Sequence, residues 1–502
     1  MTVEIANNCR KTPYFSIISS ASGREFCNAL FRVFLGIIRA LIFLINHNLF
    51  AGQTEAILSV TTSIQADLLV SVKWLIPVQP QGAVLEDHCI AIKANKIVAI
   101  CSQADAETAI SATESIHLPK HALIPGLINA HGHSPMSLMR GIADDVPLSE
   151  WLEESIWPLE SRFVSEDFVL AGANLAIAEM IRSGTTCFAD MYFYPDQVAK
   201  ACLAANLRVQ LASPILDFPT VWAQDADEYI AKATKLHDDY RHSELIHTAF
   251  GPHAPYTVSD APLKKLSTLA EEMDLPIHMH VHETAKEVSD ALASDGRTPV
   301  ERLKQLGLLS PRLVCVHATE LSSEDIRSLA EAGSHIAHCP ESNLKLASGF
   351  CEVSKLSKAG INVALGTDGC ASNNDLDMIS EMRTAALLAK GVAQDASALP
   401  AQQALEMATI NGARALGLDA MIGSLEVGKY ADMTAIDLDS LNSTPIYNPI
   451  SQIVYATQAS QVSHVWCSGQ QLLKDGEFTG LDIQAIKSAS AEWQAKLAAA
   501  ND

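Results

Sequence analysis

The 502-residue sequence predicts an α/β fold, a (β/α)8 TIM barrel with a small β-sandwich domain formed by both flanks of the chain. Three observations support this prediction. Apolar, strand-like runs alternate eight times with helix-like stretches across about 270 residues of the central part. Short runs of alternating polarity occur in both flanks. Histidines and an aspartate recur where the central strands end, which is where a barrel places its functional side chains.

The two flanks have similar patterns. Short runs of alternating apolar and polar residues occupy 66–70, 89–92, 96–100, 433–437 and 462–466. Such runs, separated by turn residues, are typical of strands in a partly buried sheet. We therefore expect a composite sheet domain from residues 61–122 and 424–480, a metal-dependent barrel over 123–423, and a C-terminal helical tail over 481–502.

Each central strand is recognised as an apolar run, and most of these runs precede an amphipathic helical stretch. The runs begin at Leu123, Thr185, Arg208, Ile246, Pro276, Leu313, His335 and Asn362. Helical periodicity is clear over Asp225–Tyr240 and Ser322–Ala332. A doubly wound open sheet is the alternative fold, but it gives no reason for ligand side chains to recur at so many strand ends.

The first sixty residues differ from the rest, and we expect a leader that is disordered or results from a mis-assigned start. Residues 1–50 hold five basic and two acidic residues, and their apolar stretch Val33–Ile45 is short for a spanning helix and contains Arg39. Two alternatives stay open. One is a helix lying on a membrane surface, and the other is an export signal or anchor, for which residues 48–52 form a poor cleavage site.

Charge and cysteine content limit the function classes. Lys and Arg number 35 against 58 Asp and Glu, a formal net charge of −23, which argues against nucleic acid or an anionic membrane as the main partner. Eleven cysteines are scattered without a C-x-x-C pair, and several lie inside apolar runs. Reduced, buried thiols in a cytoplasmic protein are the expected state.

Four residues form the expected metal site. His131 and His133 stand at i and i+2 after an apolar run, so they face the same side of a strand. His280 lies in the strand-like run 276–282, and Asp368 follows the last of the central apolar runs. Three imidazoles and one carboxylate suit one divalent metal, zinc best, while Fe²⁺ or Mn²⁺ is also accepted by such ligands.

Single residues of this site also have ordinary structural interpretations. An aspartate after a strand is often a turn or capping residue. His278 is expected to be a hydrogen-bonded core histidine, and His282 could support the ligands from behind. The shared placement at strand ends favours the metal site. Such a centre makes hydroxide near neutral pH, which predicts a hydrolase, and Glu283, just past the strand end, can reach that water.

Two further histidines end predicted strands, His253 in GPHAP and His317 in VCVHA. For either one alone, a structural role would be the default interpretation. Binuclear barrel hydrolases carry a metal-bridging lysine at the strand end that His253 occupies, so we expect a single metal and a His253 that faces the substrate. His317 is a candidate for stabilising charge on the attacking or leaving group.

The motifs PGLINAHGH, GPHAPYT, HMHVHET, CVHA, HCPESNLKLASG and GTDG resemble the amidohydrolase superfamily. Within it, the sequence looks like the chlorohydrolase/deaminase branch, and more closely like the 5′-methylthioadenosine/S-adenosylhomocysteine deaminases. The resemblance covers approximately residues 65 to 480, including TINGARALGLDAMIGSLEVGKYAD. It does not cover the leader.

Carried over by position, the resemblance implies four metal ligands: His131, His133, His280 and Asp368. It implies that Glu283 shuttles protons and that His253 contacts the substrate. In these deaminases the glutamate matching Glu160 of WLEESIWPLE accepts hydrogen bonds from ribose hydroxyls, and the tryptophan matching Trp151 lines the nucleoside pocket. Without the resemblance, Glu160 would be interpreted as an acid on a helix surface.

The expected reaction is hydrolytic deamination at C6 of an adenine nucleoside. Glu283 passes a water proton to ring N1, His317 stabilises the tetrahedral centre, and Asp368 helps to protonate the departing ammonia. The expected substrate contacts are Trp151, Glu160, His253, Glu283 and Asp368. A deaminase or chlorohydrolase for guanine, a triazine or a pterin is the alternative enzyme. A non-catalytic relative is disfavoured because every ligand is present.

One departure from the family pattern concerns the substrate. Some family members bind the homocysteine carboxylate with arginines from the barrel loops, and here only Arg241 offers itself, while the loop after the third strand carries Asp217 and Trp222. We therefore expect a preference for the uncharged methylthio nucleoside. A homo-oligomer is an open expectation.

Overall fold

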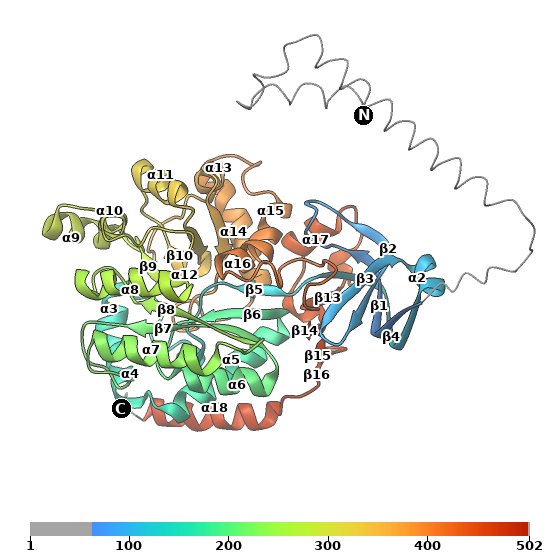
Figure 1. The fold of residues 1–502 in the computed structure, drawn as a ribbon, viewed down its shortest axis with the longest axis horizontal. Coiled ribbons are helices and arrows are strands. Elements are labelled where there is room, and N and C mark those ends of the chain that lie inside the picture. Colours follow the sequence, from blue (N-terminus) through green and yellow to red (C-terminus); the bar gives the residue numbers. More distant parts are fainter. Residues whose placement is uncertain (1–62, 500–502) are drawn as a thin grey trace, which may run out of the picture. The chain divides into compact units, whose positions relative to one another are not determined.

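Two eight-stranded sheets organise residues 63–499, the part of the chain that the computed structural model describes (Figure 1). One sheet is parallel, and the other combines strands from both flanks. The leader expected over residues 1–60 lies outside the described residues. Residues 63–499 belong to one structural unit, so the domain boundaries placed within it from the sequence remain predictions.

The parallel sheet is the expected (β/α)8 barrel. Its strands are β5 (Leu127–Asn129), β6 (Thr185–Asp190), β7 (Arg208–Ile215), β8 (Ile246–Pro252), β9 (Ile277–Val281), β10 (Leu313–His317), β11 (His335–His338) and β12 (Asn362–Leu365). Two backbone hydrogen bonds join the last strand to the first, from Ala130 N to Leu365 O at 2.8 Å and from Asp368 N to His131 O at 3.1 Å. These bonds close the ring.

Helices surround the ring on its outside; most connect successive barrel strands, and the last three follow β12 (Figure 1). They are α5 (Glu166–Arg182), α6 (Pro195–Ala205), α7 (Ala226–Tyr240), α8 (Asp260–Met273), α9 (Ala285–Asp295), α10 (Pro299–Gln305), α11 (Ser323–Ala332), α12 (Pro340–Lys345), α13 (Val353–Lys358), α14 (Met378–Ala393), α15 (Ala401–Met407) and α16 (Ile410–Ala415). Helices α7 and α11 confirm the two helices predicted from periodicity. Each begins after an N-cap, Asp225 or Ser322, whose side chain accepts a hydrogen bond from a first-turn amide.

The segment between β5 and α5 is an excursion of short helices over the barrel. It contains a 3₁₀ helix η1 (Ser134–Met139), α3 (Leu148–Glu150), a π-helical turn η2 (Trp151–Ile156) and α4 (Trp157–Phe163). Gly172 of α5 allows η1 to pack closely, because a Cβ there would lie 2.4 Å from the carbonyl oxygen of Pro135. The excursion is thereby fixed to the barrel wall.

The second sheet joins the two flanks of the chain, as expected. Its order is β16-β15-β14-β13-β4-β1-β2-β3. The strands are β1 (Ile64–Leu75), β2 (Leu85–Lys93), β3 (Lys96–Ser102), β4 (Ile110–Pro125), β13 (Met433–Asp437), β14 (Val462–Cys467), β15 (Gln470–Lys474) and β16 (Glu477–Phe478), with α2 (Gln103–Ala109) before β4. Because the long strand β4 pairs with β1 on one side and β13 on the other, all eight strands belong to one sheet, the small sheet domain predicted from both flanks of the chain. Val70, Ile90, Met433 and Trp466 pack together in its core.

The first barrel strand begins later than predicted. Residues 123–125 belong to β4, where they pair with β13, and the barrel strand β5 has only three residues. Between the two strands, Gly126 passes so close to Thr186 that a Cβ would lie 2.0 Å from its hydroxyl oxygen. The apolar run is continuous in sequence, so its pattern does not reveal the change of sheet.

A buried ion pair joins the barrel to the second sheet. Arg208, the first residue of β7, donates to both carboxylate oxygens of Asp432 at 3.1 and 3.2 Å. Ser468 N also donates to Asp432 at 2.7 Å. Both side chains of the pair are almost fully buried. Loss of one partner would leave an unpaired charge in the interior.

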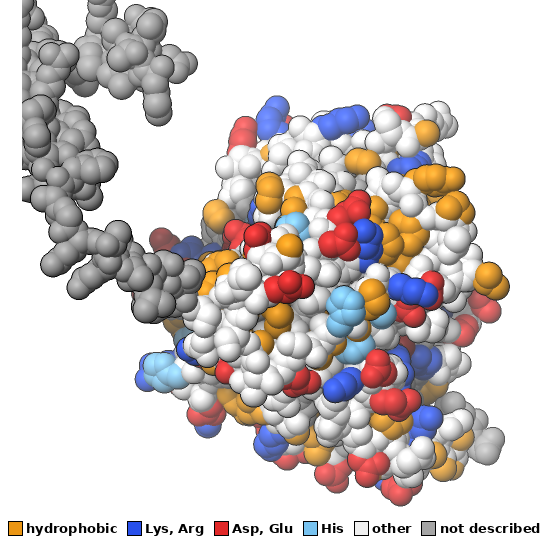
Figure 2. Space-filling view, turned by 90° about the vertical axis from the view of Figure 1, so that its right-hand side faces the viewer, with side chains coloured by type: hydrophobic (Ala, Val, Ile, Leu, Met, Phe, Trp, Pro, Cys, Tyr) orange, Lys and Arg blue, Asp and Glu red, His pale blue; other side chains and the backbone are white. Residues whose placement is uncertain are grey.

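Helix α17 (Pro449–Tyr455) lies between β13 and β14, and α18 (Ile483–Ala498) follows β16. Trp493 of α18 packs edge-to-face on Phe168 of α5 at 5.2 Å between ring centroids. No helix within residues 63–499 combines the length and the apolar character needed to cross a membrane. On the face shown in Figure 2, acidic and basic side chains are interspersed.

Candidate metal centre and active site

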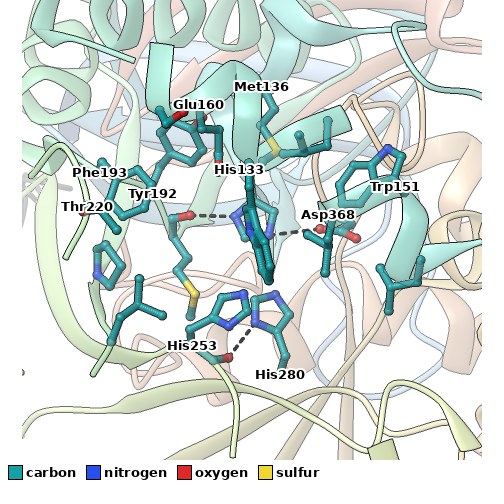
Figure 3. A pocket seen from close by; sticks show the side chains of 18 of the residues that line it. His133, Met136, Trp151, Glu160, Tyr192, Phe193, Thr220, His253, His280 and Asp368 are labelled. Carbon is teal, nitrogen blue, oxygen red and sulfur yellow. Dashed lines mark hydrogen bonds and ion pairs between the residues drawn. The ribbon is translucent and has the colours of Figure 1, made fainter. Parts of the chain in front are cut away.

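The six candidate side chains lie at the same rim of the barrel, where the strands end. Four of them, His133, His253, His280 and Asp368, are labelled in Figure 3. His131 and His133 follow β5, His253 follows β8, His280 lies in β9, His317 ends β10 and Asp368 follows β12. In β9 the side chains alternate. Met279 and Val281 pack in the main core, and His280 faces the rim. The barrel therefore brings together residues that are far apart in the sequence.

Four of these residues converge on one point. Nε2 of His131 and Nε2 of His133 lie 3.3 and 3.2 Å from Oδ1 of Asp368. The ring of His280 lies against both imidazoles, with centroid distances of 4.9 Å to His131 and 5.5 Å to His133. The ligand atoms of His131, His280 and His317 also lie within 4.8 Å of one another, so His317 borders the same point.

The far side of each imidazole is fixed by a hydrogen bond. Nδ1–H of His133 donates to the carbonyl oxygen of Met191 at 2.6 Å, and Nδ1–H of His280 donates to that of His253 at 2.7 Å. A carbonyl oxygen can only accept, so both rings carry their proton on Nδ1. Each therefore presents the lone pair of Nε2 to the common point, as metal-binding histidines do.

The arrangement fits a divalent metal. Nδ1 of His131 lies 2.9 Å from Nε2 of His278, which is therefore the hydrogen-bonded core histidine expected from the sequence. Nε2 of His131 is buried and has no hydrogen-bond partner among the described residues. Imidazole lone pairs and a carboxylate that face one another in a buried space repel unless a cation lies between them. The nitrogen and oxygen donors are those that zinc and similar metals prefer, so the site is built for one divalent ion.

Asp368 is held in its ionised form. Burial alone would raise the pKa of Asp368, but its close contacts with His131 and His133 outweigh burial and hold that pKa well below its ordinary value. The hydroxyls of Ser342 and Ser372 donate to Oδ2 at 2.7 and 2.8 Å. Oδ1 therefore faces the histidines while Oδ2 is fixed from behind.

Glu283 and His317 form a second pair beside the ligands. Oε2 of Glu283 lies 3.8 Å from Nε2 of His317. Burial raises the pKa of Glu283, although His317 opposes this effect. Nδ1–H of His317 donates to Oδ1 of Asn343 at 2.9 Å, which turns Nε2 towards the carboxylate. A buried carboxyl with a raised pKa next to an imidazole is suited to transfer protons near neutral pH.

A cavity of about 290 Å³ lies over this pair and the ligands (Figure 3). Most of its walls are apolar, and these residues include Leu148, Ile156, Trp157, Phe193, Phe218 and Val221. Among the described residues that line it, none is Lys or Arg. A small, largely apolar cavity with a few polar groups is typical of a site for a neutral small molecule.

Glu160 and Trp151 reach this cavity from the excursion over the barrel. Both are buried, with 9% and 5% of their surface exposed. Burial raises the pKa of Glu160 to about 7, although Tyr192 and His133 oppose it. The indole Nε1 of Trp151 has no hydrogen-bond partner among the described residues. The interpretation of Glu160 as an acid on a helix surface is therefore excluded.

His253 also lines the cavity, next to His280, whose ring centroid is 4.9 Å away. Its Nδ1 lies 3.2 Å from the hydroxyl of Thr257, which leaves Nε2 free of that contact. Burial lowers the pKa of His253 to about 4, and the neighbouring His133 and His131 add to this effect. The ring is therefore neutral at physiological pH.

Two sequence-based suggestions are wrong. His282 does not support the ligands. Its φ of +55° breaks the alternation of β9, and its ring contacts Glu320 O at 2.9 Å and Val300 N at 3.2 Å, away from the metal site. Arg241 is no ligand for a substrate carboxylate. It follows α7 near the start of β8, at the other end of the barrel, with 56% of its side chain exposed.

Sequence reasoning missed three residues that hold the site together, Ser342, Asn343 and Ser372. Ser342 and Asn343 lie in the motif HCPESNLKLASG, and Ser372 is four residues after Asp368. The motif marked the segment, but no rule of spacing indicates that a serine will donate to a carboxylate on another strand. Only the folded barrel brings these groups together.

Comparisons with known proteins agree with this geometry. Residues 122–472 match the amidohydrolase family. A 5-methylthioadenosine/S-adenosylhomocysteine deaminase of Saccharophagus degradans is 51% identical over 439 residues, which are 88% of this chain and 98% of that protein. A 5′-deoxyadenosine deaminase of Methanothermobacter thermautotrophicus is 44% identical over 82% of this chain and 95% of its own length.

A solved structure is also similar. It is an adenosine deaminase from Xanthomonas campestris with bound zinc, which has a TM-score of 0.86 and 47% sequence identity over 87% of this chain and 100% of that chain. The family match covers more than half of the sequence and includes the first and the last strand of the barrel. With its barrel, its strand-end ligands and these relatives, the chain belongs to the amidohydrolase family.

Proposed function

We propose that the protein deaminates the adenine ring of 5′-substituted adenosines, with 5′-methylthioadenosine and S-adenosylhomocysteine as the reference substrates. Water and the nucleoside are converted to the inosine analogue and ammonia. One observation carries the proposal: two buried carboxyls, Glu283 and Glu160, line the same small, largely apolar cavity as the candidate metal ligands. The names of the relatives agree with it.

The metal would be held by His131, His133, His280 and Asp368. Zinc, which the Xanthomonas campestris relative binds, suits this donor set, and Fe²⁺ or Mn²⁺ is accepted by the same kinds of ligand. When bound, such an ion supplies an acidified water near neutral pH.

The residues around that water divide the proton transfers. Glu283 takes a proton from water and delivers it to ring N1, which makes C6 electrophilic. The water oxygen then bonds to C6, and His317 stabilises the charge that develops on that oxygen from its Nε2 side. Asp368 accepts the remaining water proton and returns it to the amino nitrogen, so that the C6–N bond breaks and ammonia leaves. Each acid–base role is typically worth ~10²–10⁴ in rate.

The cavity would orient the nucleoside. The Glu160 carboxylate is a suitable acceptor for the two ribose hydroxyls, and Trp151 offers an indole wall beside them. His253, neutral and next to His280, would contact the purine. Glu283 and Asp368 would contact the atoms that react.

The absence of Lys and Arg from the described lining suggests a preference within the substrate class. A methylthio group can lie against Phe218 and Val221, whereas the carboxylate of a homocysteine group would lose water without meeting a cation. We therefore expect kcat/KM to be higher for 5′-methylthioadenosine than for S-adenosylhomocysteine. The reverse order would contradict this preference but leave the deamination itself intact.

The test is ammonia release by the metal-loaded enzyme from a panel of substrates. The panel holds 5′-methylthioadenosine, adenosine, S-adenosylhomocysteine, free adenine, guanine and an aminotriazine. We expect turnover of the adenine nucleosides, little with the free bases, and loss of most turnover in Glu283→Gln with unchanged metal content. Faster turnover of guanine or the triazine would favour the alternative enzyme. A protein that binds no metal and turns over nothing would be the non-catalytic relative.

A cytoplasmic location and a homo-oligomeric state complete the proposal. All nine cysteines within residues 63–499 are free thiols, as expected in a reducing compartment. Leu344, Phe350 and Leu387 are exposed around one surface groove on α12 and α14, which a second subunit could cover. Cell fractionation and light scattering of the purified protein test the two statements.

A further inference from the structure

A second carboxylate, Glu287, lies next to Glu283 in the helix that follows β9. Thr284 is the N-cap of α9, and its hydroxyl accepts a hydrogen bond from Glu287 N at 3.2 Å. A Thr-x-x-Glu spacing of this kind predicts a capping box, in which the glutamate accepts from the backbone N–H of the cap residue itself. Here the carboxylate reaches past the cap. It accepts from His282 N at 3.0 Å through Oε1 and from Glu283 N at 2.7 Å through Oε2.

The next helix shows that the spacing alone does not produce this contact. Thr298 is the N-cap of α10, and its hydroxyl accepts from Glu301 N at 3.1 Å, in the same Thr-x-x-Glu arrangement. The Glu301 side chain is exposed and makes no hydrogen bond within the described part of the chain. The reach of Glu287 is therefore a property of the turn between β9 and α9.

That turn is held in an unfavourable backbone conformation. His282 has a φ of +55°, a left-handed conformation that is costly for a residue with a side chain. Its ring is fixed by Val300 N and Glu320 O, and its carbonyl oxygen accepts from Thr319 N at 2.9 Å. The carboxylate of Glu287 satisfies the remaining polar group, the backbone N–H.

Glu287 and Thr319 also fix the backbone of Glu283, one on each side of its Cα. Glu287 accepts from its N–H, and the Thr319 hydroxyl donates to its carbonyl oxygen at 2.8 Å. Glu283 thus leaves the turn from a backbone that is anchored on each side of its Cα. The strained residue directly before it would otherwise be free to relax and to carry the Glu283 side chain away from the metal ligands.

We propose that Glu287 is a positioning residue for Glu283: it fixes the turn from which Glu283 reaches the water and the substrate ring. The inference rests on the role proposed for Glu283 above. Glu283 must reach first the water and then ring N1, so the rate of the reaction depends on the position of its carboxyl group. A displacement of about 1 Å can lower that rate by ~10².

The first test is Glu287→Gln. Glutamine has one acceptor oxygen, so its amide group would turn N–H towards one of the two backbone N–H groups and lose that hydrogen bond. We expect kcat to fall about 10- to 100-fold while KM stays within about threefold. Metal content and melting temperature should remain close to those of the wild type. Glu301→Gln is the matched control and should behave as the wild type in all four measurements.

The second test is a double-mutant cycle with Glu283→Gln, measured as single turnovers at high enzyme concentration. If Glu287 acts through Glu283, adding Glu287→Gln to Glu283→Gln should lower the residual rate no further. An additive loss, or a loss of activity that follows a loss of metal, would overturn the inference. So would a fully active Glu287→Gln beside an inactive Glu283→Gln, and in that case the proposed function would stand. A Glu283→Gln enzyme with wild-type turnover would remove both.

Discussion

The ionisation of Glu160 should control how well the enzyme captures its substrate. The carboxyl is 9% exposed, and burial raises its pKa to about 7. The ionised form accepts hydrogen bonds from both ribose hydroxyls through its two oxygens, and these bonds are stronger than those to the protonated carboxyl. Because the raised pKa means that the carboxylate exists above about pH 7 and is lost as the pH falls, kcat/KM for a nucleoside should decrease on the acid side.

The size of the effect follows from that pKa. A group with a pKa of about 7 is roughly 90% ionised at pH 8 and roughly 10% ionised at pH 6, so kcat/KM should fall about ninefold between them. Glu160→Gln keeps one acceptor oxygen and loses the charge. Since a hydrogen bond to a charged group contributes about 1.5–3 kcal/mol, this variant should lose about 10- to 100-fold in kcat/KM at pH 8.

The assay is kcat/KM for 5′-methylthioadenosine, followed by ultraviolet absorbance from about pH 5.5 to about pH 8.5. The matched substrate is an adenosine analogue without the 2′ and 3′ hydroxyls. Its kcat/KM should be low at every pH and should not change in Glu160→Gln. If kcat/KM decreased at low pH in the same way in the wild type and in Glu160→Gln, the decrease would have to come from the titration of another group. An equal loss for both substrates in Glu160→Gln would refute the contact between Glu160 and the ribose.

Three further perturbations test the fold and the metal site. Gly366→Ala should lower the amount of bound metal found by elemental analysis, because the added Cβ would lie 2.7 Å from the backbone nitrogen of His131. Gly391→Ala is the control. No atom lies within 4 Å of its added Cβ, so the metal content should stay unchanged. Arg208→Leu should reduce the free energy of unfolding in urea by about 3–5 kcal/mol, since it leaves Asp432 buried and unpaired; replacing both residues by leucine should recover much of this loss. Removal of metal with a chelator should lower the melting temperature, because a ligand at about 100 times its Kd stabilises the folded state by about 2.7 kcal/mol. Restored stability after addition of Zn²⁺ would support the site, and a melting temperature that ignores the chelator would contradict it.

The barrel and its candidate ligands were predictable because their signals are local. A strand that is buried on both sides leaves an apolar run, and a ligand at its end follows that run directly, as Asp368 follows β12. The two histidines after β5 could be placed on one side of the chain by counting residues. Each inference needed only the order of residues and the rule that barrel sites lie at strand ends.

The contacts between segments were not predictable in this way. The run 123–129 is uniformly apolar, and nothing in it marks Gly126 as the point where the chain leaves one sheet for the other. The serines behind Asp368 come from two segments, and a serine is compatible with any surface turn. The contact of Glu287 with the turn could not be predicted either, because Glu287 has the same spacing from Thr284 as Glu301 has from Thr298.

The backbone at the strand ends explains why alternation succeeds within the strands and fails where the chemistry occurs. His282, His317 and Asp368, which end or follow β9, β10 and β12, have φ values of +55°, +71° and +64°. A residue in the left-handed conformation points its side chain in a different direction from that in a strand, so the alternation of strand side chains no longer predicts that direction. Each such residue costs roughly 1–2 kcal/mol, about 3–6 kcal/mol for the three together. The hydrogen bonds around His282 and the supports of His317 and Asp368 can offset this cost in the folded protein. Rim positions that alternation does not predict are therefore the first places to look for residues that this fold has fixed for catalysis.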